Sequence, residues 1–164
     1  MARPWRRRSP FGELEMVSEY VARHYPNDEA RFHVRLGAPT QATAAQLPAG
    51  VAKAIRMAFA RWADAVVITP TELVVVEGKM RSDAGAISQL ELYGDLVPYT
   101  PELAEFTGRR TRLELVVCIE DPVVTRMAEA RRITVRVYRP SWLPEWIEKR
   151  NRRESRPRRP GAPA

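Results

Sequence analysis

Hydrophobic and polar positions follow two different periods along the chain, and the changes between them mark the expected elements. Residues 10–24 and 49–63 carry apolar side chains at helical spacing, whereas residues 31–37 alternate as a strand does. Two apolar strands, divided at Pro70, come directly after the second helical stretch. The predicted strands from there on are 64–70, 71–80, 110–120 and 133–140, and the predicted helices are 83–97, 123–132 and 144–153.

The order of these elements predicts an α/β fold. Helices and strands alternate, and such alternation is typical of a mixed central sheet flanked by helices. Several of the predicted strands are apolar at successive positions, which fits a sheet that is covered on both faces. A chain of 164 residues is long enough for one domain with a substantial core.

Composition excludes several classes of protein. Cys118 is the one cysteine, so a disulfide framework or a cysteine zinc site within one chain is excluded. No apolar run approaches the roughly 18 residues of a membrane span, and residues 1–11 lack the apolar segment of a signal peptide. We therefore expect a protein without a membrane partner that is cytoplasmic, or virion-associated if a phage encodes it.

The net charge of +7 is concentrated at the two ends. Residues 1–9 contain four arginines, and residues 149–164 contain seven basic residues and one acid, which leaves residues 10–148 mildly acidic. We expect a basic arm at 1–9, a folded domain at 10–148, and a disordered Pro/Arg-rich tail at 149–164. Such ends either solubilise the protein or contact a polyanion such as nucleic acid.

The two strands around Pro70 predict a cluster of charges. A tight turn over 69–72, with proline in its second position, places residues whose numbers sum to 141 opposite one another. The expected antiparallel pairs are Ile68 with Leu73, Val66 with Val75, and Asp64 with Glu77. Side chains alternate along a strand, so Lys79 shares the side of Glu77, and Gly78 points the other way.

Two carboxylates opposite each other are unfavourable, and each buried charge costs several kcal/mol unless it is compensated. A divalent cation would compensate both, since Mg²⁺ takes one or two carboxylates together with water and substrate phosphate. The alternative is structural: Glu77 and Lys79 form an ordinary ion pair at a strand end, and Asp64 caps the start of its strand. In the following helix Gln89 and Tyr93 are four residues apart and share a face.

Asp64, the strand "VVVEGKM" and the helix segment "QLELY" together resemble the PD-(D/E)XK nuclease superfamily, in the branch with a Q-x-x-x-Y motif after the catalytic strand. The resemblance implies a restriction-endonuclease-like αβββαβ core, with an inserted helix near 51–62. It implies that Asp64 and Glu77 hold Mg²⁺ or Mn²⁺, with the Gly78 carbonyl as a further ligand. Lys79 would support the attacking water, and Gln89 and Tyr93 would shape the site and approach DNA.

The superfamily often carries one more acid on its first helix, for which Glu13, Glu15 and Glu19 compete. Glu13 falls inside the apolar arc of that helix, and Glu19 falls toward solvent, so we choose Glu13. The alternative is an acid favoured only by the helix dipole. The family's usual proline before the aspartate is here Ala63.

Other residues are candidates either for nucleic-acid contacts or for structural roles in the fold. Arg81 is placed to reach a phosphate, and Arg109 and Arg110 are placed to add to a DNA-facing edge. We interpret His24 and His33 as structural or surface residues. Trp142 and Trp146 are expected to pack the C-terminal segment onto the domain.

The resulting hypothesis is a metal-dependent nuclease that hydrolyses DNA phosphodiester bonds. A second hypothesis is a non-catalytic protein of the same fold, either a structural or assembly component, such as one of a phage virion, or a nucleic-acid-binding subunit. It would act as a homo-oligomer or within a larger assembly. A third is a nucleic-acid binder that acts through its basic tail alone.

Overall fold

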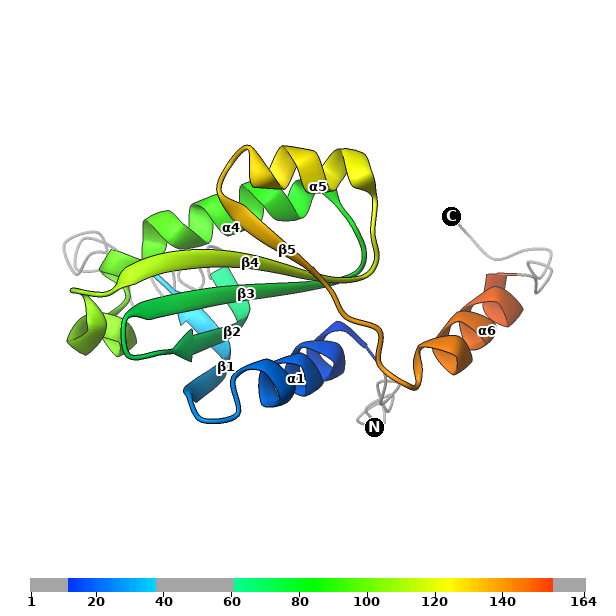
Figure 1. Cartoon of the computed structure of the whole chain (residues 1–164), viewed down its shortest axis with the longest axis horizontal. Coiled ribbons are helices and arrows are strands. Elements are labelled where there is room, and N and C mark those ends of the chain that lie inside the picture. The colour runs from blue at the N-terminus through cyan, green and yellow to red at the C-terminus, as the bar shows by residue number, and fades with distance from the viewer. Residues whose placement is uncertain (1–11, 38–60, 155–164) are drawn as a thin grey trace, which may run out of the picture.

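The computed structural model describes residues 12–37 and 61–154 of the chain (Figure 1). Two 3₁₀ helices, η1 (Val97–Tyr99) and η2 (Pro101–Phe106), lie between α4 and β4. The helices are α1 (Glu13–His24), α4 (Ala84–Leu96), α5 (Pro122–Glu129) and α6 (Leu143–Glu154). The strands are β1 (Glu29–Leu36), β2 (Arg61–Ile68), β3 (Glu72–Arg81), β4 (Arg110–Ile119) and β5 (Ile133–Val137).

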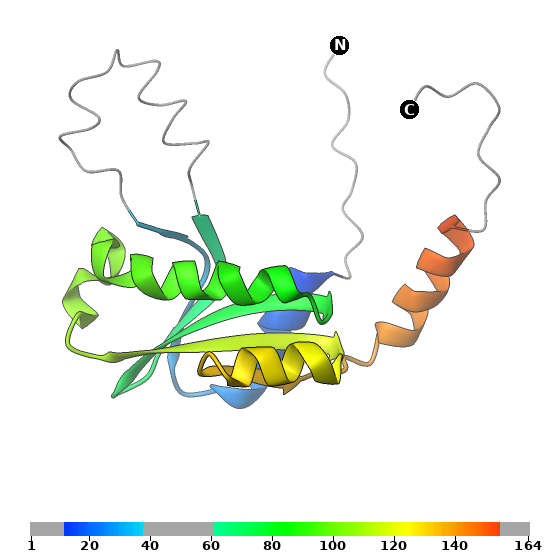
Figure 2. The ribbon, with the colours of Figure 1, turned by 90° about the horizontal axis from the view of Figure 1, so that it is seen from above.

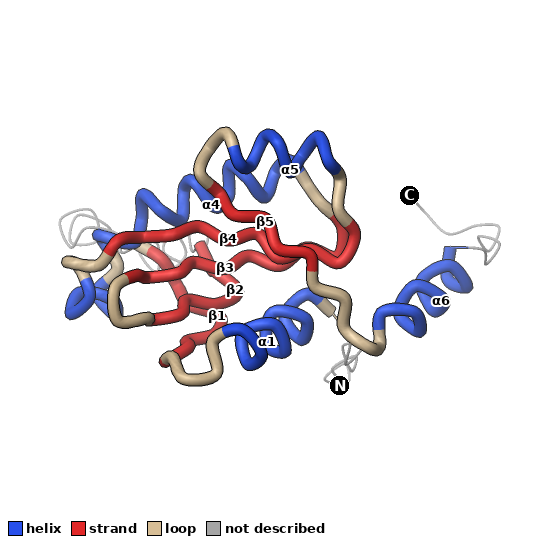
Figure 3. Tube along the Cα trace, in the orientation of Figure 1, coloured by secondary structure: helices blue, strands red, loops and turns tan. Residues whose placement is uncertain are grey.

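The five strands form one mixed sheet in the order β1-β2-β3-β4-β5 (Figure 3). β2 is antiparallel to both β1 and β3, whereas β4 runs parallel to both β3 and β5. The parallel pairs need crossover connections, and α4 and α5 supply them. The predicted α/β class, with a mixed sheet flanked by helices, is confirmed, and α1 to β4 follow the order αβββαβ.

Each face of the sheet is covered by a different set of helices (Figures 1 and 2). On one face, side chains of α4 and α5 pack on the sheet, with Ile87, Leu90 and Val124 among them. On the other face, Met16 and Val17 of α1 pack together with Trp142 and Leu143 at the start of α6. The predicted packing of Trp142 and Trp146 onto the domain is therefore confirmed. The later part of α6 projects from the body in both views.

The turn at Pro70 forms as the sequence predicts. The Thr69 amide donates to the Glu72 carbonyl at 3.0 Å, and the Glu72 amide donates to the Thr69 hydroxyl at 2.9 Å. Asp83 caps α4, as its carboxylate accepts from the Gly85 amide at 2.9 Å. The pairs Ile68–Leu73 and Val66–Val75 are present in the β2–β3 ladder.

The predicted pair of Asp64 with Glu77 is wrong, because among the described residues the ladder ends one pair earlier, at Ala65 with Val76. Near this point the strand changes sides: Ala63 packs in the α4-side core and Ala65 in the α1-side core. Across the ladder, His33 of β1 has a left-handed backbone with φ of 52°. The pairing of β1 with β2 continues past this point, whereas the pairing of β2 with β3 stops.

One other boundary differs from the prediction. Residues 61–63, expected at the end of a helix, begin β2, and the rest of that predicted helix lies outside the described residues. The helix expected over 144–153 is present as α6, and the division between domain and tail at 148/149 stays a prediction. Within residues 12–37 and 61–154, no helix is long and apolar enough to cross a membrane.

Candidate active site

The candidate site lies where β2 separates from the end of β3. The Gly78 amide donates to Oδ2 of Asp64 at 2.8 Å. The Asp64 side chain thus accepts from a backbone amide beyond the last β2–β3 pair, and a buried amide needs such a partner. Although Asp64 does not pair with Glu77 in the ladder, this hydrogen bond holds its carboxylate beside the next residue of β3.

Glu77 is buried, with 3% of its surface exposed. Its Oε1 accepts from Nζ of Lys79 at 2.7 Å. Its Oε2 is also buried and has no hydrogen-bond partner in the described part of the chain. The predicted ion pair is therefore present, but it gives a hydrogen-bond partner to only one of the two carboxylate oxygens. Buried polar atoms without a partner are uncommon in folded proteins, so the other oxygen needs an explanation.

The electrostatics of the cluster show that its members interact. Burial raises the pKa of Glu77 to about 7, and the charge of Asp64 adds to the effect against the opposing influence of Lys79. Burial also raises the pKa of Asp64. Partial burial lowers the pKa of Lys79, but the hydrogen bond and charge of Glu77 outweigh it and leave that pKa raised. Asp64, Glu77 and Lys79 are therefore brought together, as predicted.

Gly78 points away from these charges, toward α1. A Cβ atom at this position would lie 2.5 Å from Cγ2 of Val17 and 3.0 Å from Cε of Met16. Glycine at this position thus lets α1 lie directly against the end of β3. Since α1 begins at Glu13, this close packing also positions the side chain of that residue.

Glu13 reaches the end of β3, where its Oε1 accepts from the Met80 amide at 3.2 Å. Its charge contributes to the raised pKa values of Asp64 and Glu77. The structure thus places the chosen acid beside the site. The prediction that Glu19 faces solvent is wrong: it is half-buried, and its carboxylate accepts from Nε1 of Trp142 at 2.7 Å. The C-terminal segment covers this side of α1, which the pattern of α1 alone does not reveal.

Gln89 and Tyr93 face the site from α4. The Tyr93 hydroxyl donates to the Trp62 carbonyl at 2.7 Å and accepts from Nε2 of Gln89. Burial raises the pKa of Tyr93, and the charges of Glu77 and Asp64 contribute. The pair therefore ties α4 to β2 two residues before Asp64, and its role in shaping the site stays a prediction. Its approach to DNA stays a prediction.

His33 and Trp62 are neighbours of the site that the sequence does not reveal. Their rings are stacked, with centroids 4.5 Å apart, and the charge of His33 acts to lower the pKa of Asp64. The ladder of β1 with β2 would place His33 opposite Asp64. A single histidine without a partner at metal-ligand spacing gives no sequence signal of this position.

The three predicted nucleic-acid contacts separate into two places. Arg81 is the last residue of β3, two residues after Lys79. Arg110 lies at the other end of the sheet, where it pairs with Glu72. Arg109 stacks on Phe106 at 4.8 Å and donates to the Thr69 carbonyl. Lys79 lies seven residues further along β3 than Glu72, a distance of roughly 23 Å. A contact by Arg109 or Arg110 would therefore lie far from the site, and it stays a prediction.

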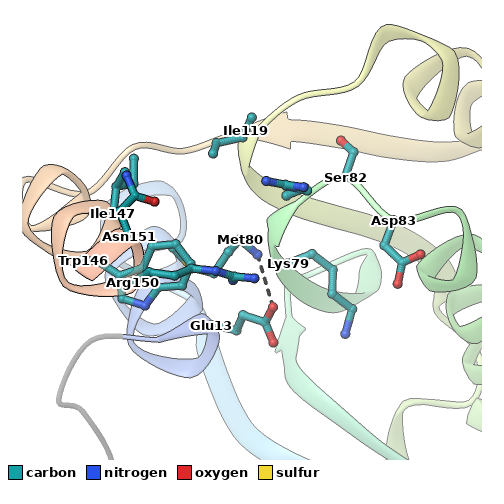
Figure 4. A pocket seen from close by; sticks show the side chains of 11 residues that line it. Glu13, Lys79, Met80, Ser82, Asp83, Ile119, Trp146, Ile147, Arg150 and Asn151 are labelled. Carbon is teal, nitrogen blue, oxygen red and sulfur yellow. Dashed lines mark hydrogen bonds between the residues drawn. The ribbon is translucent and has the colours of Figure 1, made fainter. Parts of the chain in front are cut away.

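A cavity of about 570 Å³ adjoins the site (Figure 4). Glu13 and Lys79 line it on the side of the acids, and α6 lines it on the other side through Trp146 and Arg150. Arg81 and Met80 also belong to its lining. Lys79 therefore belongs both to the acid cluster and to the lining of the cavity.

The described residues fit a divalent cation held by two carboxylates. They contain no group of three or more histidine, cysteine, aspartate or glutamate side chains that could hold a metal ion. Mg²⁺ does not need such a group, because it is commonly bound through one or two carboxylates, with water and phosphate completing its shell. The unpaired Oε2 of Glu77, beside the charge of Asp64, provides the kind of donor that this cation requires. The part of the Gly78 carbonyl stays a prediction.

No protein-family model matches the chain, and no curated protein matches it either. Among solved structures, it is similar to a repair endonuclease from Pyrococcus abyssi, at 15% identity and a TM-score of 0.49 over 81% of this chain and 50% of that chain. It is also similar to the structure of an EndoMS complex with double-stranded DNA, at 17% identity and a TM-score of 0.49 over 85% of this chain and 49% of that chain. The chain thus spans about half the length of each.

Proposed function

We propose that this protein is a nuclease of the PD-(D/E)XK type that hydrolyses phosphodiester bonds in DNA with a divalent cation, Mg²⁺ or Mn²⁺. The observation that carries the proposal is the buried, unpartnered Oε2 of Glu77 next to Asp64 and Lys79. A structural ion pair needs neither that free oxygen nor a second acid beside it. Both features are expected if the acids hold a cation.

Asp64 and Glu77 would hold the cation, with the Gly78 carbonyl as a further ligand. When bound, it would polarise a phosphate oxygen and lower the pKa of a water. Glu77 must be ionised for this role. Its raised pKa means that burial and the charge of Asp64 disfavour the ionised form, which a bound cation would stabilise. Glu13 adds negative charge at the rim of the site.

Lys79 is suited to orient the attacking water and to stabilise charge that develops on the phosphate. Its ammonium group contacts Glu77, its side chain is 22% exposed, and the residue belongs to the lining of the cavity. The three nearby acids raise its pKa, so the ammonium group stays protonated at neutral pH. Donors aimed at developing charge in a partly desolvated site contribute strongly to catalysis.

The direct test is DNA cleavage by the full chain in Mg²⁺, in Mn²⁺ and in EDTA, on single- and double-stranded substrates. We expect cleavage that requires the cation, and a loss of at least about 100-fold in Lys79→Met, in the range measured for a positioned proton-transfer or charge-stabilising group. Lys149→Met is the matched control, since Lys149 lies on α6 and pairs with Glu145 instead.

Wild-type protein that cleaves none of these substrates in either cation would contradict the proposal. It would favour a non-catalytic protein of this fold that acts in assembly or in nucleic-acid binding. Cleavage that is the same in Lys79→Met as in the wild type would show that another group, or another protein in the preparation, performs the reaction.

A further inference from the structure

The cavity beside Lys79 has a second wall that the proposed chemistry does not use. α6 projects from the body, and its side chains face the end of β3 across the cavity (Figure 4). From α6 come Trp146 and Arg150, and from the end of β3 come Arg81 and Lys79. We call this space the α6 groove.

The α6 groove presents positive charge beside the site. Its lining includes Lys79, Arg81 and Arg150, and its two acids are engaged with backbone amides, Glu13 with Met80 and Asp83 with Gly85. The Arg81 side chain is exposed and makes no hydrogen bond or ion pair with any residue that the structure describes. Three basic residues outnumber two acids in this lining, so a ligand with negative charge fits the groove.

Trp146 supports Arg150. The guanidinium carbon of Arg150 lies 5.4 Å from the centroid of the Trp146 ring, a distance at which a cation is attracted to the face of an aromatic ring. Trp146 itself packs against the α1-side core. Arg150 is therefore connected through Trp146 to the body of the domain. Arg152, on the same helix, pairs with Glu148.

We propose that the α6 groove receives the phosphodiester backbone of the nucleic-acid strand next to the cleaved bond, with Arg81 and Arg150 contacting phosphates on that strand. This inference rests on the proposed nuclease function, because the strand must continue from a phosphate held at Lys79. Arginine suits phosphate through its planar set of donors.

The test compares Arg150→Ala with Arg152→Ala in the full chain. Both remove one positive charge from α6, but only Arg150 lines the groove. Binding of a fluorescent 20-nucleotide DNA strand and of its duplex is measured in EDTA over a range of salt concentrations. We expect Arg150→Ala to weaken binding about fivefold or more at low salt and to reduce the log–log salt slope by about one. Arg81→Ala should act in the same way, and Arg152→Ala should stay within twofold of wild type.

Equal effects of Arg150→Ala and Arg152→Ala would overturn the inference, because general attraction by a basic helix would then explain the binding. Wild-type protein that binds a polyglutamate peptide of equal length as tightly as DNA would overturn it too. The two proposals fail separately, because this assay needs no cation. If the protein cleaves DNA but Arg150→Ala binds DNA as the wild type does, only the proposal for the α6 groove is rejected. If Arg150→Ala weakens binding but the wild type cleaves no DNA, only the nuclease proposal is rejected.

Discussion

In EDTA, the protein is expected to lose about 3 kcal/mol of stability through Glu77 as the pH rises from about 4.5 to about 7. The folded state raises the pKa of this carboxyl from 4.5 to about 7. Between these values the folded chain holds a proton that the unfolded chain has released, so stability falls with rising pH. Each pKa unit corresponds to about 1.4 kcal/mol. Asp64, whose pKa is also raised by burial, acts in the same direction.

Urea unfolding at pH 5, 6, 7 and 8 measures this effect when wild type is compared with Glu77→Gln. The variant cannot ionise at position 77, so it should match wild type near pH 5 and exceed its stability at pH 8. Glu15→Gln is the control, because Glu15 is exposed on α1. A wild-type-to-Glu77→Gln difference that stays constant across these pH values would contradict the account of Glu77 as a buried, unsatisfied acid.

Substitution of Gly78 is expected to destabilise the protein strongly and to displace α1 from the site. In Gly78→Ala the new methyl group would overlap Cγ2 of Val17, a stiff β-branched side chain, at 2.5 Å. Overpacking of this kind costs about 1–3 kcal/mol, and Gly78→Val should exceed that range. Because Glu13 begins the same helix, its contact with Met80 should be lost as well.

Denaturant unfolding checks this expectation, with Gly108→Ala as the control, since a Cβ there meets no described atom within 4 Å. A double-mutant cycle with Val17→Ala identifies the contact: removing Cγ2 should recover part of the loss in Gly78→Ala. Additive effects of the two substitutions would show that Gly78 is needed for a reason other than the approach of α1.

The hairpin of β2 and β3 follows from local patterns that are visible in the sequence. Pro70 between two apolar runs determines a tight turn, and that turn determines the register of β2 with β3 near it. Alternation along β3 then places Gly78 toward α1 and separates it from Glu77 and Lys79. The charged residues are noticeable because they interrupt a run that is otherwise apolar on both faces.

The remaining parts depend on contacts between distant segments. The β2–β3 ladder ends where β2 changes sides between Ala63 and Ala65. No local sequence pattern predicts this change. Residues 61–63 fit a helical period and an alternating one equally well, and their pairing with β1 decides in favour of the strand. Glu19 is drawn to Trp142, more than 120 residues away, for the same reason.

The α6 groove is likewise not evident from sequence. The helical pattern and the basic composition of its residues are visible, but the position of Trp146 and Arg150 opposite Lys79 arises only when the C-terminal segment packs beside α1. The sequence pattern therefore places Trp146 at the end of the domain and Arg150 in a tail, although both residues line the cavity beside the acids.

Divalent-cation binding at pH 8 tests most directly whether two acids and a lysine at the opened end of the hairpin form a cation site. Thermal unfolding is followed while Mg²⁺ or Mn²⁺ is added to wild type, Asp64→Asn, Glu77→Gln and Glu15→Gln. A cation at 100 times its dissociation constant should stabilise the wild type and Glu15→Gln by about 2.7 kcal/mol, and should leave Asp64→Asn and Glu77→Gln unchanged. Equal stabilisation of all four proteins, or no stabilisation of the wild type at millimolar cation, would contradict the account.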